Sequence, residues 1–244
     1  NPFETWLMIV LIVGMSLGGY IAYKFFGRNA GILLGGFLGG AVSSTATTVS
    51  YSRIARRDRG LGGSTAIVVM IASTVVYGRI LIETAVVNDE FLTTLATPVL
   101  VLAGLTFLPA VVLWFRGRKK TATMPELSNP TQMTSALMFG GMYALVMVAL
   151  AAGNHFLGHH GLYAIAAISG LTDMDAITLS TARTALTDAS VAAEGWRLIV
   201  IGSLANLVFK AAIAWMLGGR ALLGKVAILF AFPMLGGIAM LVLL

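Results

Sequence analysis

The stretch GLYAIAAISGLTDMDAITLSTAR, residues 161–183, decides the fold because it is long and apolar enough to cross a bilayer and yet carries two acids. A helix of about 20 mostly apolar residues spans the hydrocarbon core of a membrane. Asp173 and Asp175 lie near the middle of this stretch. A carboxylate at that depth is costly, so it indicates a functional site.

The composition indicates an all-α integral membrane protein. Of the 244 residues, 58% are hydrophobic and 11% charged, and the mean hydropathy is +0.90. A soluble domain carries far more charge, and apolar runs without period-two alternation exclude an outer-membrane barrel. The chain has no cysteine, which excludes disulfides and thiol catalysis. The net charge of +6 comes mostly from loops beside apolar runs, where it sets topology and indicates no nucleic-acid partner.

Eight apolar runs predict about eight transmembrane helices. They cover residues 6–26, 31–52, 65–87, 92–115, 134–156, 161–183, 196–217 and 222–244. The hydrophilic stretch 116–130 is the natural linker between a first four-helix unit, residues 1–115, and a second, residues 131–244.

The two units repeat each other at a fixed offset of 130 residues. Six identities occur at that offset: Gly31 and Gly161, Gly40 and Gly170, Ala46 and Ala176, Thr48 and Thr178, Ser50 and Ser180, Arg53 and Arg183. The same offset pairs Ser43 with Asp173 and Thr45 with Asp175. An even number of spans in each unit predicts repeats in parallel orientation, with the second and sixth helices facing each other.

Both of these helices are predicted to be broken near the membrane midplane. Residues two apart on a regular helix point about 200° away from each other, so Asp173 and Asp175 share one site only if the helix is interrupted. Gly170 before the acids, and Gly39 and Gly40 before Ser43, are where a break would be tolerated. The exposed carbonyls, hydroxyls and carboxylates would form an oxygen-rich site of the kind that hard cations prefer.

The candidate ion-binding residues are the polar groups of the paired stretches and one amide of the seventh span: Asp173, Asp175, Thr172, Thr178, Ser43, Ser44, Thr45, Thr47 and Asn206. Asp173 and Asp175 are the candidate metal ligands, and Arg79 and Lys210 are candidate counter-charges. Two simpler interpretations stay open. The hydroxyls would bond to their own helix, and the two acids and two bases would neutralise one another as structural ion pairs.

The distribution of basic residues predicts the orientation. If both termini lie on one side, that side receives the cluster Arg53, Arg56, Arg57 and Arg59, together with the bases after the fourth and sixth spans. The other side receives Lys24, Arg28, Arg220 and Lys225. The positive-inside rule then predicts a multi-pass protein of the cell (inner) membrane with both termini in the cytoplasm.

Three segments carry a family resemblance: GGFLGGAVSSTATTVSYSRIARR, ELSNP and SGLTDMDAITLS, followed by Asn206 and Lys210. They resemble the membrane domain called domain of unknown function 4010, which is similar to the C-terminal half of MgtC/SapB-type membrane proteins. The resemblance covers nearly the whole chain and implies a membrane location and an association with magnesium or other divalent cations. A separate MgtC-like domain often precedes this domain, and the chain starts at Asn1 without an initiator Met, so we expect a piece of a longer protein.

We therefore expect a transporter or channel-like carrier for an inorganic cation, with divalent metals among the candidates and proton coupling available. One alternative is a non-transporting regulatory or assembly protein, and another is a carrier of small anions. No enzyme is expected, since the acids lack the Gly-x-Gly-Asp element of intramembrane aspartyl proteases and lie on one span. No cofactor is expected beyond a bound metal cation. The partners are the lipid bilayer, the ion and, through glycine faces such as Gly31 and Gly35, a second copy in a homodimer.

Overall fold

The computed structural model describes residues 2–26, 32–116, 148, 161–171 and 173–244. Within these ranges the chain is helical and has no strand, which confirms the all-α class. The elements are α1 (Pro2–Phe26), α2 (Ile32–Arg57), η2 (Arg59–Leu61), α3 (Gly62–Val87), α4 (Asp89–Arg116), a helix at Gly161–Leu171, α6 (Met174–Thr184), α7 (Ala189–Ile213), η3 (Ala214–Gly218) and α8 (Arg220–Leu243). Apart from Val148, the predicted fifth span lies outside the described residues, as do residues 117–130 of the linker and Thr172.

The described helices support the predicted multi-pass membrane protein. Five are long and apolar enough to cross a membrane: Ile32–Arg57, Arg59–Val87, Asp89–Arg116, Ala189–Gly218 and Arg220–Leu243. Large apolar side chains such as Leu108 and Leu235 point outward from α4 and α8. Outward-facing apolar side chains suit contact with lipid tails, because hydrocarbon is the solvent of a spanning helix.

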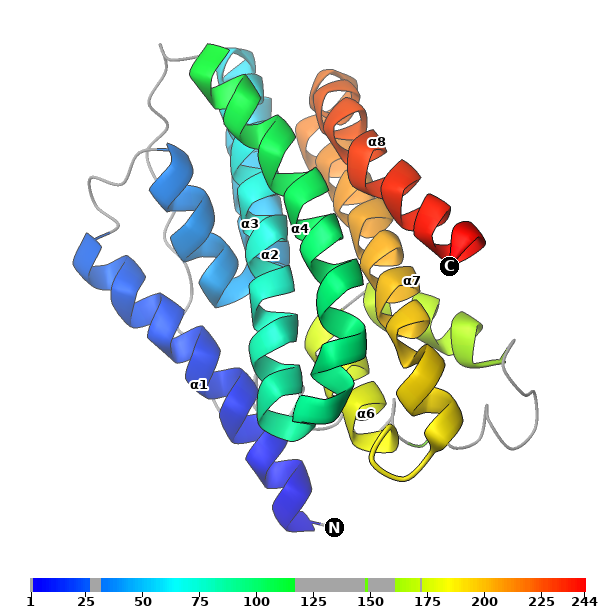
Figure 1. Cartoon of the computed structure of the whole chain (residues 1–244). Coiled ribbons are helices and arrows are strands. Elements are labelled where there is room, and N and C mark those ends of the chain that lie inside the picture. The colour runs from blue at the N-terminus through cyan, green and yellow to red at the C-terminus, as the bar shows by residue number, and fades with distance from the viewer. Residues whose placement is uncertain (1, 27–31, 117–147, 149–160, 172) are drawn as a thin grey trace.

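Helix α2 folds back on itself. Ser43 has extended backbone angles, φ −167° and ψ 114°, in the middle of the helix. A Cβ atom on Gly39 would lie 2.7 Å from Thr47 Oγ1, a contact that a straight helix does not allow between residues eight apart. Ile32 packs in one cluster with Tyr51, so the two ends of α2 lie close together. We call residues 32–57 hairpin 1; Figure 1 shows its two arms meeting at the bend.

The helix at Gly161–Leu171 and α6 form a second such unit, residues 161–184, which we call hairpin 2. Asp173, between the two arms, has extended backbone angles of φ −153° and ψ 138°. Leu162 and Tyr163, at the start of the first arm, border the same small pocket as Val191 at the start of α7. The second arm also leads into the start of α7, so hairpin 2 enters and leaves at one end of the helix bundle (Figure 1). The predicted breaks thus occur in both helices.

The two hairpins point in opposite directions. Asn88, at the end of α3, donates a hydrogen bond of 3.1 Å to the carbonyl of Ala182, near the end of hairpin 2. At the other end of the bundle, Lys225 Nζ lies 3.1 Å from the position that a Cβ atom of Gly62 would take at the start of α3. Helix α3 therefore begins at the end of the bundle where α7 finishes and α8 begins, and it ends at the end where α7 begins. It runs antiparallel to α7 (Figure 1).

This arrangement corrects two predictions. The bases Arg56 and Arg59 lie beside Arg220 and Lys225 around one pocket, so the prediction that they lie on opposite sides is wrong. Parallel repeats are also wrong for the described helices, because α2–α4 and their counterparts in the second half run in opposite directions. The physical reason is the hairpin: a segment that turns back in place of a spanning helix changes the side on which every later helix starts.

One apolar core joins the two halves. It contains Tyr77, Ile80 and Leu102 from α3 and α4 together with Ile177 from α6 and Ile199 from α7. The halves therefore pack as one body, and Met174, beside the bend of hairpin 2, is part of this core.

Candidate functional site

The bends of the two hairpins have the same local design. Ser43 Oγ accepts a hydrogen bond of 3.2 Å from the backbone N–H of Ala46, and Asp173 Oδ1 accepts one of 3.0 Å from that of Asp175. Each side chain caps the helix that forms the second arm of its hairpin, since the first N–H groups of a helix lack partners within it. The two capping residues are 130 positions apart, the offset found in the sequence.

The last carbonyls of the first arms are bound by side chains from the helix that follows each hairpin. Arg79 Nη1, on α3, donates to the carbonyl of Ala41 at 3.3 Å. Asn206 Nδ2, on α7, donates to the carbonyl of Gly170 at 2.8 Å. These bonds satisfy backbone groups that the bends leave exposed, which a membrane interior requires.

Close backbone contacts hold both hairpins against these same helices. A Cβ atom on Gly40 would lie 2.7 Å from Ala72 Cα on α3. A Cβ atom on Gly170 would overlap the backbone of Gly202 on α7. Both members of the second contact are 130 positions beyond those of the first, so the offset relates packing as well as residue types.

A cavity of about 630 Å³ lies between the two bends. It brings together seven of the predicted residues: Ser43, Ser44, Thr45, Arg79, Asp173, Asp175 and Asn206. Hydroxyls from hairpin 1 face carboxylates from hairpin 2 across it. Seven of the predicted residues therefore lie around one cavity, although the halves around it run antiparallel.

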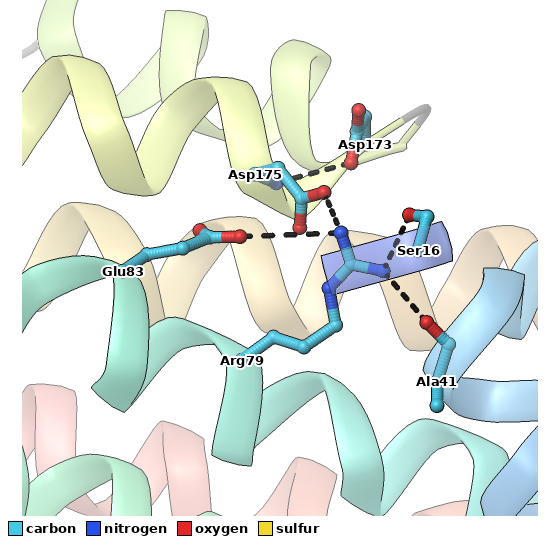
Figure 2. A network of polar contacts seen from close by, with 6 residues as sticks. All are labelled: Ser16, Ala41, Arg79, Glu83, Asp173 and Asp175. Carbon is cyan, nitrogen blue, oxygen red and sulfur yellow. Dashed lines mark hydrogen bonds and ion pairs between the residues drawn. The ribbon is translucent and has the colours of Figure 1, made fainter. Parts of the chain in front are cut away.

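Arg79 is the centre of a charged network in the wall of this cavity (Figure 2). Its Nη2 atom pairs with the carboxylate of Asp175, and its Nη1 atom also donates to Ser16 Oγ on α1 at 3.3 Å. Glu83 Oε1 lies 4.0 Å from the same Nη2 atom. One guanidinium thus faces two carboxylates, and the interpretation of Asp175 as half of an ion pair describes this structure.

Asp173 is held differently from Asp175. One oxygen of its carboxylate caps the second arm of hairpin 2, while the other, Oδ2, is buried without a hydrogen-bond partner. A buried carboxylate oxygen without a donor is unfavourable unless a cation, a proton or water satisfies it. Asp173 therefore lines the cavity and keeps one carboxylate oxygen without a hydrogen-bond partner.

Three other predicted residues lie away from the cavity wall. Thr47 and Thr178 are fully buried, and their hydroxyl oxygens have no hydrogen-bond partner. Lys210 is 1% exposed and donates to Ser73 Oγ at 3.2 Å, so it meets a hydroxyl where the sequence suggested a carboxylate. The interpretation of membrane hydroxyls as bonded to their own helix applies to Thr48, which donates to the Ser44 carbonyl at 2.8 Å.

Glu83 and Ser16 are site residues that sequence reasoning left out. Glu83 is an acid inside an apolar run, four residues after Arg79 and so on the same face of its helix. That spacing was an available signal. Ser16 is one hydroxyl in an apolar run, and nothing in its neighbourhood marks it. Among the described residues, no group of three or more His, Cys, Asp or Glu side chains is placed to hold a metal ion.

The fold is that of a helical protein whose long apolar helices are compatible with several membrane crossings, and in it two oppositely directed hairpins meet at a cavity. The chain belongs to the family described as "Domain of unknown function (DUF4010)", whose profile matches residues 10–218. An uncharacterized protein of Aquifex aeolicus (strain VF5) is 28% identical over 218 residues, which cover 85% of this chain and 90% of that protein. No solved structure matches the chain. The family expected from the motifs is confirmed; its expected link to MgtC/SapB proteins stays an expectation.

Proposed function

We propose that this protein is a secondary transporter for a small inorganic cation, which binds in the cavity between the two hairpin bends. The observation that carries the proposal is the meeting of two interrupted, oppositely directed hairpins at a cavity lined by Asp173, whose carboxylate keeps one oxygen without a hydrogen-bond partner. Transporters often consist of inverted repeats whose broken helices place carbonyls and helix ends around a substrate near the membrane midplane.

The charges of the cavity favour a monovalent cation. Asp175 is neutralised by Arg79, so Asp173 is the carboxylate left to balance a bound charge. Hydroxyls of Ser43, Ser44 and Thr45 supply neutral oxygen ligands from the opposite wall. A divalent metal would need a second free carboxylate, which means that Arg79 would first have to leave Asp175.

The corrected topology also changes the proposed orientation. One end of the bundle is formed by the ends of α2 and α4 and the starts of α3 and α8, and the sequence puts seven bases there: Arg53, Arg56, Arg57, Arg59, Arg116, Arg220 and Lys225. The other end holds Arg183 and Arg197 with four acids: Asp89, Glu90, Asp188 and Glu194. By the positive-inside rule, the first end faces the cytoplasm of a cell membrane, and both termini then lie on the opposite side.

A small-anion carrier is the second candidate. The second arm of hairpin 1 begins at the cavity, and its Ser43 cap carries no negative charge. A helix N-terminus attracts anions, and Arg79 in the same wall would add a positive charge if Asp175 were protonated. This candidate differs from the first in the sign of the transported ion, which a flux assay measures directly.

Replacing Asp173 with Asn tests the proposal in proteoliposomes loaded in turn with Li⁺, Na⁺, K⁺ or Mg²⁺. Asn caps helices as well as Asp does, so the hairpin should fold. We expect flux of the transported cation to fall at least about tenfold, since a hydrogen bond or contact to a charged group contributes roughly 1.5–3 kcal/mol.

The matched control is Asp188→Asn, which alters another helix-capping aspartate, at the start of α7 and outside the cavity lining. Its flux should equal that of the wild type. A folded Asp173→Asn protein with wild-type cation flux would contradict the proposed site. Flux of chloride or phosphate without any cation flux in the wild type would favour the anion carrier.

A further inference from the structure

A second cavity, of about 490 Å³, lies at the end of the bundle where α3 and α8 begin. Four basic side chains line it: Arg56, Arg59, Arg220 and Lys225. The first two come from the end of hairpin 1 and from η2, and the last two come from the first turns of α8. This cavity, which we call the basic pocket, therefore lies between the two halves of the chain, beside the start of α8 in Figure 1.

The charges of these four bases are unbalanced in the described part of the chain. Among the described residues, no Asp or Glu lines the basic pocket or forms an ion pair with one of its bases. The acid nearest in sequence, Asp58, accepts a hydrogen bond of 2.8 Å from the backbone N–H of Gly60 and caps η2. Like charges around one cavity repel one another, and a bound anion relieves that repulsion.

The start of α8 adds to the positive potential of the basic pocket. Its N-cap, Gly219, has no side chain with which to bond the first backbone N–H groups of the helix. Arg220 stands at the first helical position, where the helix dipole disfavours a base and favours an anion. Lys225 Nζ lies beside Gly62, at the start of α3, so a cation also faces the beginning of a second helix. An anion in the pocket would be attracted by the bases and by the start of α8 together.

The surface beside the basic pocket is apolar and exposed. Trp215 and Met216 of η3, the segment that leads into the pocket, are both exposed. On α8, Ile228 and Phe232 follow Lys225 at helical intervals of three and four residues, and both are exposed. A phospholipid has the same two parts, a charged phosphate and hydrocarbon chains, whereas a soluble phosphate compound matches the pocket alone.

We propose that the basic pocket binds the phosphate group of an anionic phospholipid, whose acyl chains lie along the exposed face of α8. Basic pockets between membrane helices on the cytoplasmic side bind anionic headgroups, and the positive-inside rule assigns this end of the bundle to the cytoplasm. The site is separate from the cavity between the bends and does not depend on transport. Because its bases come from both halves, a bound lipid would hold hairpin 1 against α8 and stabilise the folded protein.

The test removes two bases of the pocket together, with Arg220→Gln and Lys225→Gln. Native mass spectrometry of the detergent-solubilised full chain, mixed with equal amounts of phosphatidylglycerol and phosphatidylcholine, identifies the retained lipid by its mass. The wild type should retain phosphatidylglycerol in preference. The double variant should retain at least about tenfold less of it, since two bases near an anionic lipid together contribute roughly that factor in affinity.

The matched control is Arg53→Gln with Arg57→Gln, which removes two exposed bases of α2 that do not line the pocket. This control should retain phosphatidylglycerol as the wild type does. A second pocket pair, Arg56→Gln with Arg59→Gln, removes the bases of the other half and should repeat the loss even if the α8 variant does not fold. Equal losses from control and pocket variants would show general attraction to a basic surface and would overturn the site.

Inorganic phosphate distinguishes a lipid from a free anion. Phosphatidylglycerol should raise the midpoint of thermal unfolding of the wild type and of the control, and inorganic phosphate should not, because it lacks the chains that contact α8. Neither compound should raise the midpoint of the pocket variants. Retention of inorganic phosphate by the wild type, without a preference for phosphatidylglycerol over phosphatidylcholine, would overturn the assignment to a lipid.

Discussion

At the scale of single residues, Arg79 connects more of the structure than any other described side chain of the site. It pairs with Asp175 of hairpin 2, donates to the Ala41 carbonyl of hairpin 1 and donates to Ser16 of α1. A buried ion pair gains little net stability, because desolvation offsets most of the attraction. Its consequence is geometric: one side chain fixes the two bends relative to each other.

Asn206 ties hairpin 2 to α7 through its hydrogen bond to the Gly170 carbonyl, and Asn206→Leu should weaken that attachment. The substitution removes the donor to the Gly170 carbonyl and should cost about 1 kcal/mol of stability. We expect a lower midpoint of thermal unfolding in detergent. Ser203→Ala, one turn away on the same buried face, removes a hydroxyl that lacks a partner and should have little effect or stabilise slightly. Equal losses from both variants would show that the Gly170 bond is not the cause.

The sequence predicted much of the site at this scale because polar residues in apolar runs have few reasons to be there. Asp173, Asp175 and the hydroxyls near Ser43 were found in this way. The partner of each polar group could not be predicted, since partners depend on rotamers and on which helices become neighbours. Lys210 therefore bonds to Ser73 and not to an acid, and Glu83 was left out of the predicted site.

At the scale of elements, both predicted breaks are present, but their form was not predicted. A run of 26 residues such as α2 is long enough to cross a bilayer, so its length fits a kinked spanning helix equally well. A contact between the two arms, such as that of Gly39 with Thr47, distinguishes a hairpin from a kinked spanning helix. That contact links residues that no helical periodicity places together, so it appears only in three dimensions.

The close backbone contacts of the hairpins give a prediction at this scale. Gly170→Ala should destabilise the protein by about 1–3 kcal/mol, because the added methyl group overlaps the backbone of Gly202. Gly40→Ala should act similarly through Ala72. The control is Gly78→Ala on α3, where a Cβ atom would meet nothing within 4 Å, and a helical alanine is favoured by roughly 0.5–1 kcal/mol.

Thermal unfolding of the three purified variants, followed by circular dichroism, measures these changes. Gly170→Ala and Gly40→Ala should also reduce cation flux, since each displaces a bend that lines the cavity. Wild-type stability of Gly170→Ala would mean that hairpin 2 does not pack against α7 as the structure shows.

At the scale of the whole molecule, the offset of 130 residues relates two antiparallel halves. The sequence alignment paired Gly40 with Gly170 and Ser43 with Asp173, and both pairs occupy equivalent places in the structure. The direction of each half could not be predicted, because residue identities are the same whichever way a helix crosses the membrane. With α2 folded as a hairpin, the first half has three long helices that do not turn back, α1, α3 and α4, and an odd number of crossings would invert the next half, as in many transporters.

The inverted arrangement predicts which positions share a side of the membrane. The chain has no cysteine, so single cysteines can be introduced without a background. Arg59→Cys and Arg220→Cys lie at exposed positions around one pocket and should react with a membrane-impermeant maleimide from the same side of sealed vesicles. Glu90→Cys and Thr187→Cys, exposed at the opposite end, should react only from the other side.

This labelling separates the two topologies without any knowledge of function. Eight spanning helices in parallel repeats would place positions 59 and 220 on opposite sides, whereas two hairpins place them together. By the positive-inside rule, the side shared by positions 59 and 220 should be the cytoplasmic one, reached by the reagent in inside-out vesicles. Labelling of position 59 from one side and position 220 from the other would refute the inverted arrangement, and with it the proposal that the two bends approach the cavity from opposite faces of the membrane.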